Sequence, residues 1–126
     1  MNTLPDHDAA AYVADVLLLY VELPETPLRA GVQDQGRARR WHDLGIPLHV
    51  VESAFLLGSL RRLLRPADAP PLSPIRSLAY FQPVVEELTA NPPPDNYLDY
   101  LRLKLRRLSA KAVPAGVQKT PFSDDR

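Results

Sequence analysis

The side chains of this 126-residue sequence whose types and spacing suggest a function are arginines and tyrosines. Guanidinium groups bind phosphates, and exposed aromatic rings stack on unpaired bases while nearby cations hold the backbone. The pattern therefore predicts a nucleic-acid contact surface. Its candidate residues are Arg37, Arg39, Arg40, Arg61, Arg62, Arg65, Tyr97, Tyr100, Arg102, Lys104, Arg106 and Arg107.

The distribution of charge leaves a second interpretation of the same residues open. Residues 1–28 carry five acids and no base, and residues 29–65 carry seven bases and three acids. Residues 66–96 then carry one base and four acids, residues 97–126 carry seven bases and three acids, and the net charge is zero. Such blocks form either one basic face or charge pairs between helices. Tyr97 and Tyr100 can likewise be the amphipathic edges of a packed helix rather than a stacking platform.

No residue pattern in the sequence indicates catalysis, a metal or a cofactor. The absence of cysteine excludes a disulfide, a zinc–thiolate site and a thiol nucleophile. No two of the three histidines stand three or four residues apart, and no serine lies in a nucleophile elbow or a phosphate-binding loop. We therefore expect a protein that is not an enzyme and has no cofactor.

The candidate residues must be positioned by helices, because apolar residues recur at helical spacing and no stretch alternates with a period of two. Prolines separate five expected helices, at about residues 5–23, 32–44, 47–65, 74–88 and from 95 onward. Pro83 falls inside the fourth and is expected to kink or split it. The sequence thus predicts an all-α, single-domain bundle over residues 1–112 with proline-rich connectors, followed by a flexible tail at residues 113–126.

The segment at residues 37–65 organises this prediction. Gly45 stands where a left-handed helix cap is expected, and Gly58 suggests a close helix crossing. The corner resembles a helix-turn-helix, but the helix after Pro47 is too apolar to face a DNA groove. We therefore expect it to be the buried spine of the bundle, with Phe55 in the core and Trp41 anchoring the preceding helix.

The same composition bears on location and on partners. The longest apolar run, residues 16–21, is far too short to span a membrane, and the N-terminal acids do not fit a secretory signal. We therefore expect a cytoplasmic protein with no membrane contact. A protein partner or self-association is expected if the apolar spine or the leucine seam of the fifth helix is exposed.

The order of several features resembles the compact helical domain of the DnaD-like primosomal proteins. The resemblance spans residues 12–88 and rests on the segments LPETP, IPLHVVESAF and IRSLAYFQPVVEEL. The matching positions are Tyr20, Trp41, Val50, Val51, Ala54, Tyr80, Val84 and Val85, although the connections here are longer and richer in proline.

This resemblance implies binding to DNA and to replication proteins, with the basic helix after residue 96 helping to hold DNA. The expected function is a nucleic-acid-associated accessory protein of replication initiation or of a mobile element. The alternative is a protein–protein adaptor or assembly subunit without nucleic-acid contact.

Overall fold

The computed structural model describes the backbone of residues 4–112 and the side chains of residues 9–108. Over this range the chain is a single all-α domain of five packed helices, which confirms the predicted fold class. The elements are α1 (Leu4–Val21), α2 (Val32–Asp43), α3 (Leu48–Leu63), the 3-10 helix η1 (Leu78–Phe81), α4 (Gln82–Ala90) and α5 (Tyr97–Ala112). No strand occurs among these residues.

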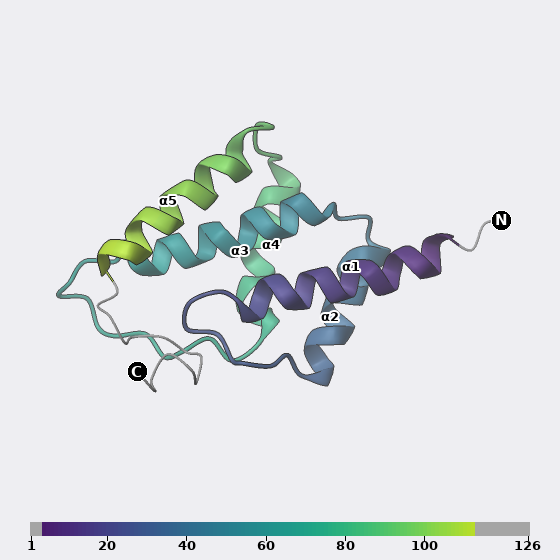
Figure 1. The fold of residues 1–126 in the computed structure, drawn as a ribbon, viewed down its shortest axis with the longest axis horizontal. Helices are drawn as coiled ribbons and strands as arrows, with labels where there is room; N and C mark the ends of the chain where they lie inside the picture. The colour runs from purple at the N-terminus through teal and green to yellow at the C-terminus, as the bar shows by residue number, and fades with distance from the viewer. Residues whose placement is uncertain (1–3, 113–126) are drawn as a thin grey trace.

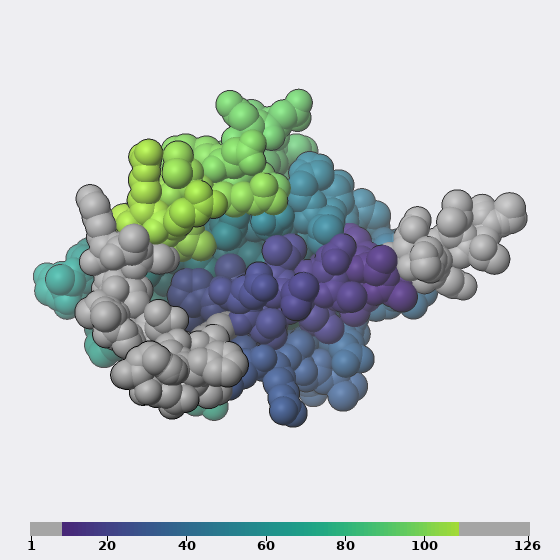
Figure 2. Space-filling model, in the orientation of Figure 1, coloured from purple at the N-terminus to yellow at the C-terminus, as the bar shows by residue number. Residues whose placement is uncertain are grey.

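Helix α3 is the spine of the bundle, as its apolar load predicts. It packs against α1, η1, α4 and α5 (Figure 1). Side chains around most of its circumference are therefore buried. Phe55 is fully buried, and so are Ser53 and Ser59, which the apolar pattern alone does not place in the core. Leu48 and Leu63, the first and last residues of the helix, are only half-buried. In Figure 2, α1 and α5 form separate ridges on the face in view.

Two glycines take the roles that the sequence predicts for them. Gly45 has a φ of 77°, which is the left-handed conformation expected of a helix cap, and it ends α2. A Cβ at Gly58 would lie 2.8 Å from Cε1 of Phe81. The close approach of α3 to η1 therefore requires a residue without a side chain at this position. Trp41 is fully buried, and its Nε1 donates a hydrogen bond of 2.9 Å to Oε1 of Gln82.

The expected start of the fourth helix at Ser73 and Pro74 is wrong. Residues 64–77 contain no helix, because prolines in this connector favour extended backbone and lack amide donors. The connector is held instead by a 2.9 Å hydrogen bond from the amide of Ile75 to the carbonyl of Glu25. The 3-10 helix η1 starts at Leu78 and is capped by Ser77, whose hydroxyl accepts a 3.2 Å hydrogen bond from the amide of Ala79. The predicted break at Pro83 is confirmed, since η1 gives way to α4 at Gln82 and Pro83 lies in the first turn of α4.

Helix α5 begins at Tyr97, two residues after the predicted start, and ends at Ala112. The tail predicted at residues 113–126 lies outside the described residues. None of the helices in the described part of the chain is long and apolar enough to cross a membrane.

Candidate nucleic-acid interface

The arginines at the end of α3 are joined to acids from other parts of the chain. Arg61 donates two hydrogen bonds to the Glu87 carboxylate, of 2.9 and 2.7 Å, and so connects α3 to α4. This interaction raises the pKa of Arg61 and lowers that of Glu87. The Arg61 charge therefore has a carboxylate partner at close range and is less available to a phosphate.

Arg62 forms the most enclosed of these ion pairs. Its side chain is only 7% exposed and bonds the Glu25 carboxylate, in the corner that follows α1. It also donates a 2.9 Å hydrogen bond to the carbonyl of Ser73, and its guanidinium lies 5.3 Å from the ring centroid of Tyr80. Arg62 thus connects the corner after α1, the end of α3 and the proline-rich connector, which is a structural role.

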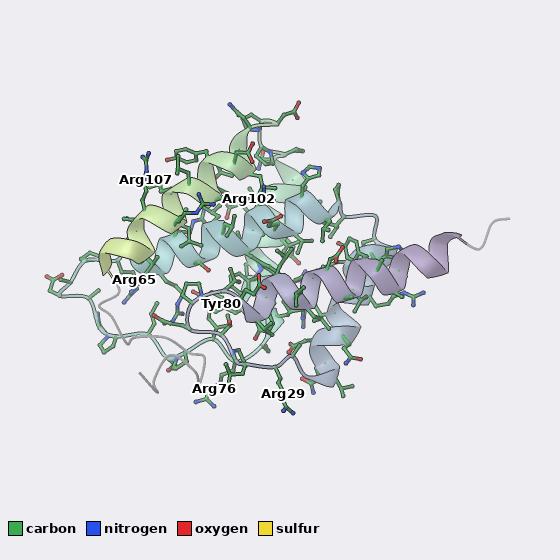
Figure 3. The ribbon with its side chains drawn as sticks, viewed as in Figure 1. Arg29, Arg65, Arg76, Tyr80, Arg102 and Arg107 are labelled. Carbon is green, nitrogen blue, oxygen red and sulfur yellow. The ribbon has the colours of Figure 1, made fainter. Side chains whose placement is uncertain are left out.

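Arg102 of α5 also pairs with an acid of another helix. It donates hydrogen bonds of 3.0 and 2.9 Å to the Glu52 carboxylate of α3, and a longer one of 3.4 Å to Asp99. In Figure 3, Arg102 lies between α5 and α3. Glu52 raises the pKa of Arg102, chiefly through the hydrogen bond between them. Arg61, Arg62 and Arg102 therefore fit the alternative interpretation of the charge blocks, in which bases pair with acids of other helices.

The bases of α2 lie apart from those of α3 and α5. Arg37 donates a 2.8 Å hydrogen bond to Gln82, and Arg39 forms a 3.1 Å ion pair with Asp43. Arg40 is exposed. Helix α2 lies on the side of the molecule away from the C-terminal ends of α3 and α5 (Figure 1). The structure therefore separates Arg37, Arg39 and Arg40 from the other candidate residues.

One group of candidate bases is free of acid partners among the described side chains. Lys104, Arg106 and Arg107 form no ion pair there, and Arg65, which donates a 2.6 Å hydrogen bond to the carbonyl of Pro70, pairs with no acid. Arg65 and Arg107 both lie at the end of the molecule where α3 and α5 finish (Figure 3). Positive charge near helix C-termini also stabilises the helices themselves.

The predicted tyrosines lie on α5 next to this group. The Tyr97 and Tyr100 rings stack at 26° with centroids 6.2 Å apart, and Lys104 Nζ lies 5.8 Å from the Tyr100 centroid. Tyr97 is half-buried, whereas Tyr100 is 53% exposed. A hollow of about 300 Å³ beside them is lined by Tyr100, Leu103, Lys104, Arg107 and Leu108. We call Tyr100, Leu103, Lys104 and Arg107 the α5 stripe.

Helix α3 does not present the polar residues that a DNA-reading helix needs. Ser53 and Ser59 are buried, and Glu52 is bound by Arg102. Of the polar residues that precede Arg61 in this helix, which are His49, Glu52, Ser53 and Ser59, only His49 is exposed. This arrangement agrees with the expectation that the helix after Gly45 is a core element.

Sequence reasoning missed two polar residues that position the elements. Asp34 is 5% exposed, and its carboxylate accepts hydrogen bonds of 2.8 Å from the amide of Gly31 and 2.9 Å from the amide of Leu78. Gln82 accepts from both Arg37 and Trp41. The place of Asp34 in the first turn of α2 is a capping signal, but nothing local indicates its contact with Leu78.

The described residues therefore define a small helical protein with a basic, aromatic stripe on its last helix. Compared with models of protein families, with curated protein sequences and with solved structures, the chain matches none of them.

Proposed function

We propose that this chain is a non-enzymatic accessory protein that binds nucleic acid, with DNA as the favoured ligand, through α5. The observation that carries the proposal is the set of Lys104, Arg106 and Arg107, which lack acid partners among the described residues. Of these, Lys104 and Arg107 line one hollow together with the exposed ring of Tyr100. Cations of this kind bind phosphates, and an exposed ring stacks on a base.

The proposed interface is smaller than the surface predicted from sequence. Arg61, Arg62 and Arg102 are left out, because turning them toward a ligand breaks the ion pairs that connect the helices. Arg65 is retained, since it lies at the same end of the molecule as Arg107 (Figure 3). A role in replication initiation or in a mobile element is supported by the resemblance to the DnaD-like domains.

The test is binding of fluorescent single-stranded and duplex DNA at about 50 mM salt, followed by anisotropy. We expect the affinity to fall steeply with added salt and to fall by about tenfold or more in the R106E/R107E variant. The matched control is R29E/R76E, which makes the same charge change at two exposed arginines that lie away from α5 in Figure 3.

Two results would contradict the proposal. The first is no binding at high micromolar protein. The second is an equal loss in both double variants, because that result reflects net charge rather than a defined surface.

A second candidate function is that of a protein–protein adaptor or assembly subunit. It is favoured by the exposed apolar side chains of the α5 stripe, Tyr100 at 53% and Leu103 at 42% exposure, beside an open hollow. Apolar side chains grouped in this manner often mark protein contacts. A mass in solution above that of one chain, together with no DNA binding, would favour this candidate over the first.

A further inference from the structure

The exposed side of α1 is acidic and partly apolar. Asp15 and Leu18 stand three residues apart on α1, so they lie on one face of the helix, and the exposed Glu22 follows its last residue, Val21. Leu18 is 59% exposed, and neither carboxylate forms an ion pair with a described side chain. Residues 9–28 contain no lysine or arginine that could neutralise this side.

A hollow of about 180 Å³ adjoins this acidic side. It lies between α1, α3 and α5, and its lining includes Leu19 of α1, Glu22 just after α1, Phe55 and Leu56 of α3, and Leu105 of α5. We call it the α1 hollow. Its size suits one side chain of the bulk of leucine or tyrosine, and Glu22 places a carboxylate in its wall.

The α5 stripe has the complementary properties. It offers two exposed apolar side chains, Tyr100 and Leu103, beside the cations Lys104 and Arg107. No acid follows Asp99 in the described part of α5, so the positive charge of this side is unopposed. The two surfaces are therefore apolar at their centres and opposite in charge at their edges.

We propose that the α1 hollow is a docking site for the α5 stripe of a second copy of this chain. Tyr100 or Leu103 of one copy enters the hollow of the other, and Lys104 and Arg107 approach Glu22 and Asp15. The occupant is a second copy because the basic edge of the α5 stripe complements the acidic edge of the α1 hollow, and every copy exposes both surfaces. Each copy carries one surface of each kind, so the contact repeats and gives a closed dimer, a ring or a chain.

This contact is expected to be weak, since one helix against a shallow hollow buries less area than a permanent interface. The proposal does not rest on nucleic-acid binding. It does share Tyr100, Lys104 and Arg107 with the proposed DNA surface, so DNA and a second copy exclude each other from α5.

A charge-exchange experiment tests the docking site. Sedimentation velocity of the full chain from about 10 µM to 1 mM, at low salt, should show a mass that rises with concentration. D15K/E22K and K104E/R107E should each weaken this association by about tenfold or more. Mixing the two variants should restore it, because the reversed charges of α1 in one then face the reversed charges of α5 in the other. D68K/D95K makes an equal charge change elsewhere and should leave association unchanged.

Three outcomes would overturn the docking site: a monomer at 1 mM, association that survives both double variants, or a mixture that does not regain association. Circular dichroism of each variant checks folding, and all substituted positions lie on the surface or partly exposed. D15K/E22K lies outside the DNA surface. Loss of self-association with retained DNA binding in this variant therefore separates this inference from the proposed function.

Discussion

Among single residues, Gly58 sets how closely α3 and η1 can approach. A Cβ at this position would lie 2.8 and 2.9 Å from two carbons of the Phe81 ring. That ring is fully buried, with its centroid 4.9 Å from that of Phe55 and 6.4 Å from that of Tyr20. The ring therefore has little room to move aside.

Replacing Gly58 with alanine should destabilise the protein by about 1–3 kcal/mol, because overpacking outweighs the helix propensity gained. Gly36, in α2, has nothing within 4 Å of an added Cβ. The same substitution at Gly36 should stabilise the protein by up to about 1 kcal/mol. Urea denaturation measures both, and equal effects of the two substitutions would contradict the close crossing.

Two tyrosines make stability depend on alkaline pH. Burial raises the pKa of both Tyr12 and Tyr20 to about 12, with the charge of Asp34 contributing at Tyr20. In the unfolded chain both hydroxyls ionise near pH 10. Because the folded pKa values are the higher ones, this contribution to stability is complete below about pH 10 and is lost as pH rises toward 12.

The measurement is the free energy of unfolding between pH 9 and 12, which should fall less steeply in Y12F/Y20F than in the unsubstituted chain. Y100F alters an exposed tyrosine and serves as the control. A slope that Y12F/Y20F leaves unchanged would show that other groups cause the alkaline loss.

At the scale of elements, Arg62 and Arg61 are neighbours on α3 with different roles. Arg62 is enclosed by the corner after α1 and by the connector, whereas the side chains of the Arg61–Glu87 pair are 52% and 44% exposed. Exposed pairs contribute little, because solvent screens them.

R62M should therefore cost about 1–3 kcal/mol of unfolding free energy, through lost hydrogen bonds to Glu25 and Ser73 and the lost contact with Tyr80. R61M should cost less than about 1 kcal/mol. Denaturant titrations of the two variants provide the comparison, and an equal cost would mean that Arg62 does not secure the connector.

The elements that follow local rules could be predicted from the sequence. The helix ends near Pro24 and Gly45, the break before Pro83 and the close crossing at Gly58 each depend on the backbone chemistry of one residue. The predicted start of the fourth helix at Ser73 was wrong, because a serine before a proline has the pattern of a helix cap even where no helix follows. The true cap at Ser77 is reinforced by Asp34, 43 positions earlier, which no local pattern shows.

In the candidate site, too, local spacing could be predicted from the sequence but contacts between distant residues could not. Tyr97 and Tyr100 lie together as their spacing predicts, since one helical turn separates them. The partners of Arg61, Arg62 and Arg102 lie 26, 37 and 50 positions away in the chain. Composition reveals that bases and acids balance, but only the packing of helices decides which of them meet.

For the whole molecule, the two proposals give α5 two competing ligands, DNA and a second copy of the chain. If a second copy and DNA use the same stripe, adding DNA shifts copies from self-association to DNA binding by mass action. We expect the sedimentation mass of the protein alone to decrease toward one chain per DNA site when a short oligonucleotide is in excess. The R106E/R107E variant, in the same experiment, should show much less response to DNA.

The attachment of α5 has a further consequence for how the fold opens. The main contact of α5 is with α3, whereas α3 is surrounded by four other elements. Local opening of α5 therefore breaks one packing interface, and opening of α3 requires the whole domain to unfold. Amide hydrogens of α5 should exchange with solvent deuterium at a lower opening free energy than those of α3. The surface proposed to bind partners would then be the part of the protein that unfolds first, and a bound partner would be detected as slower exchange in α5.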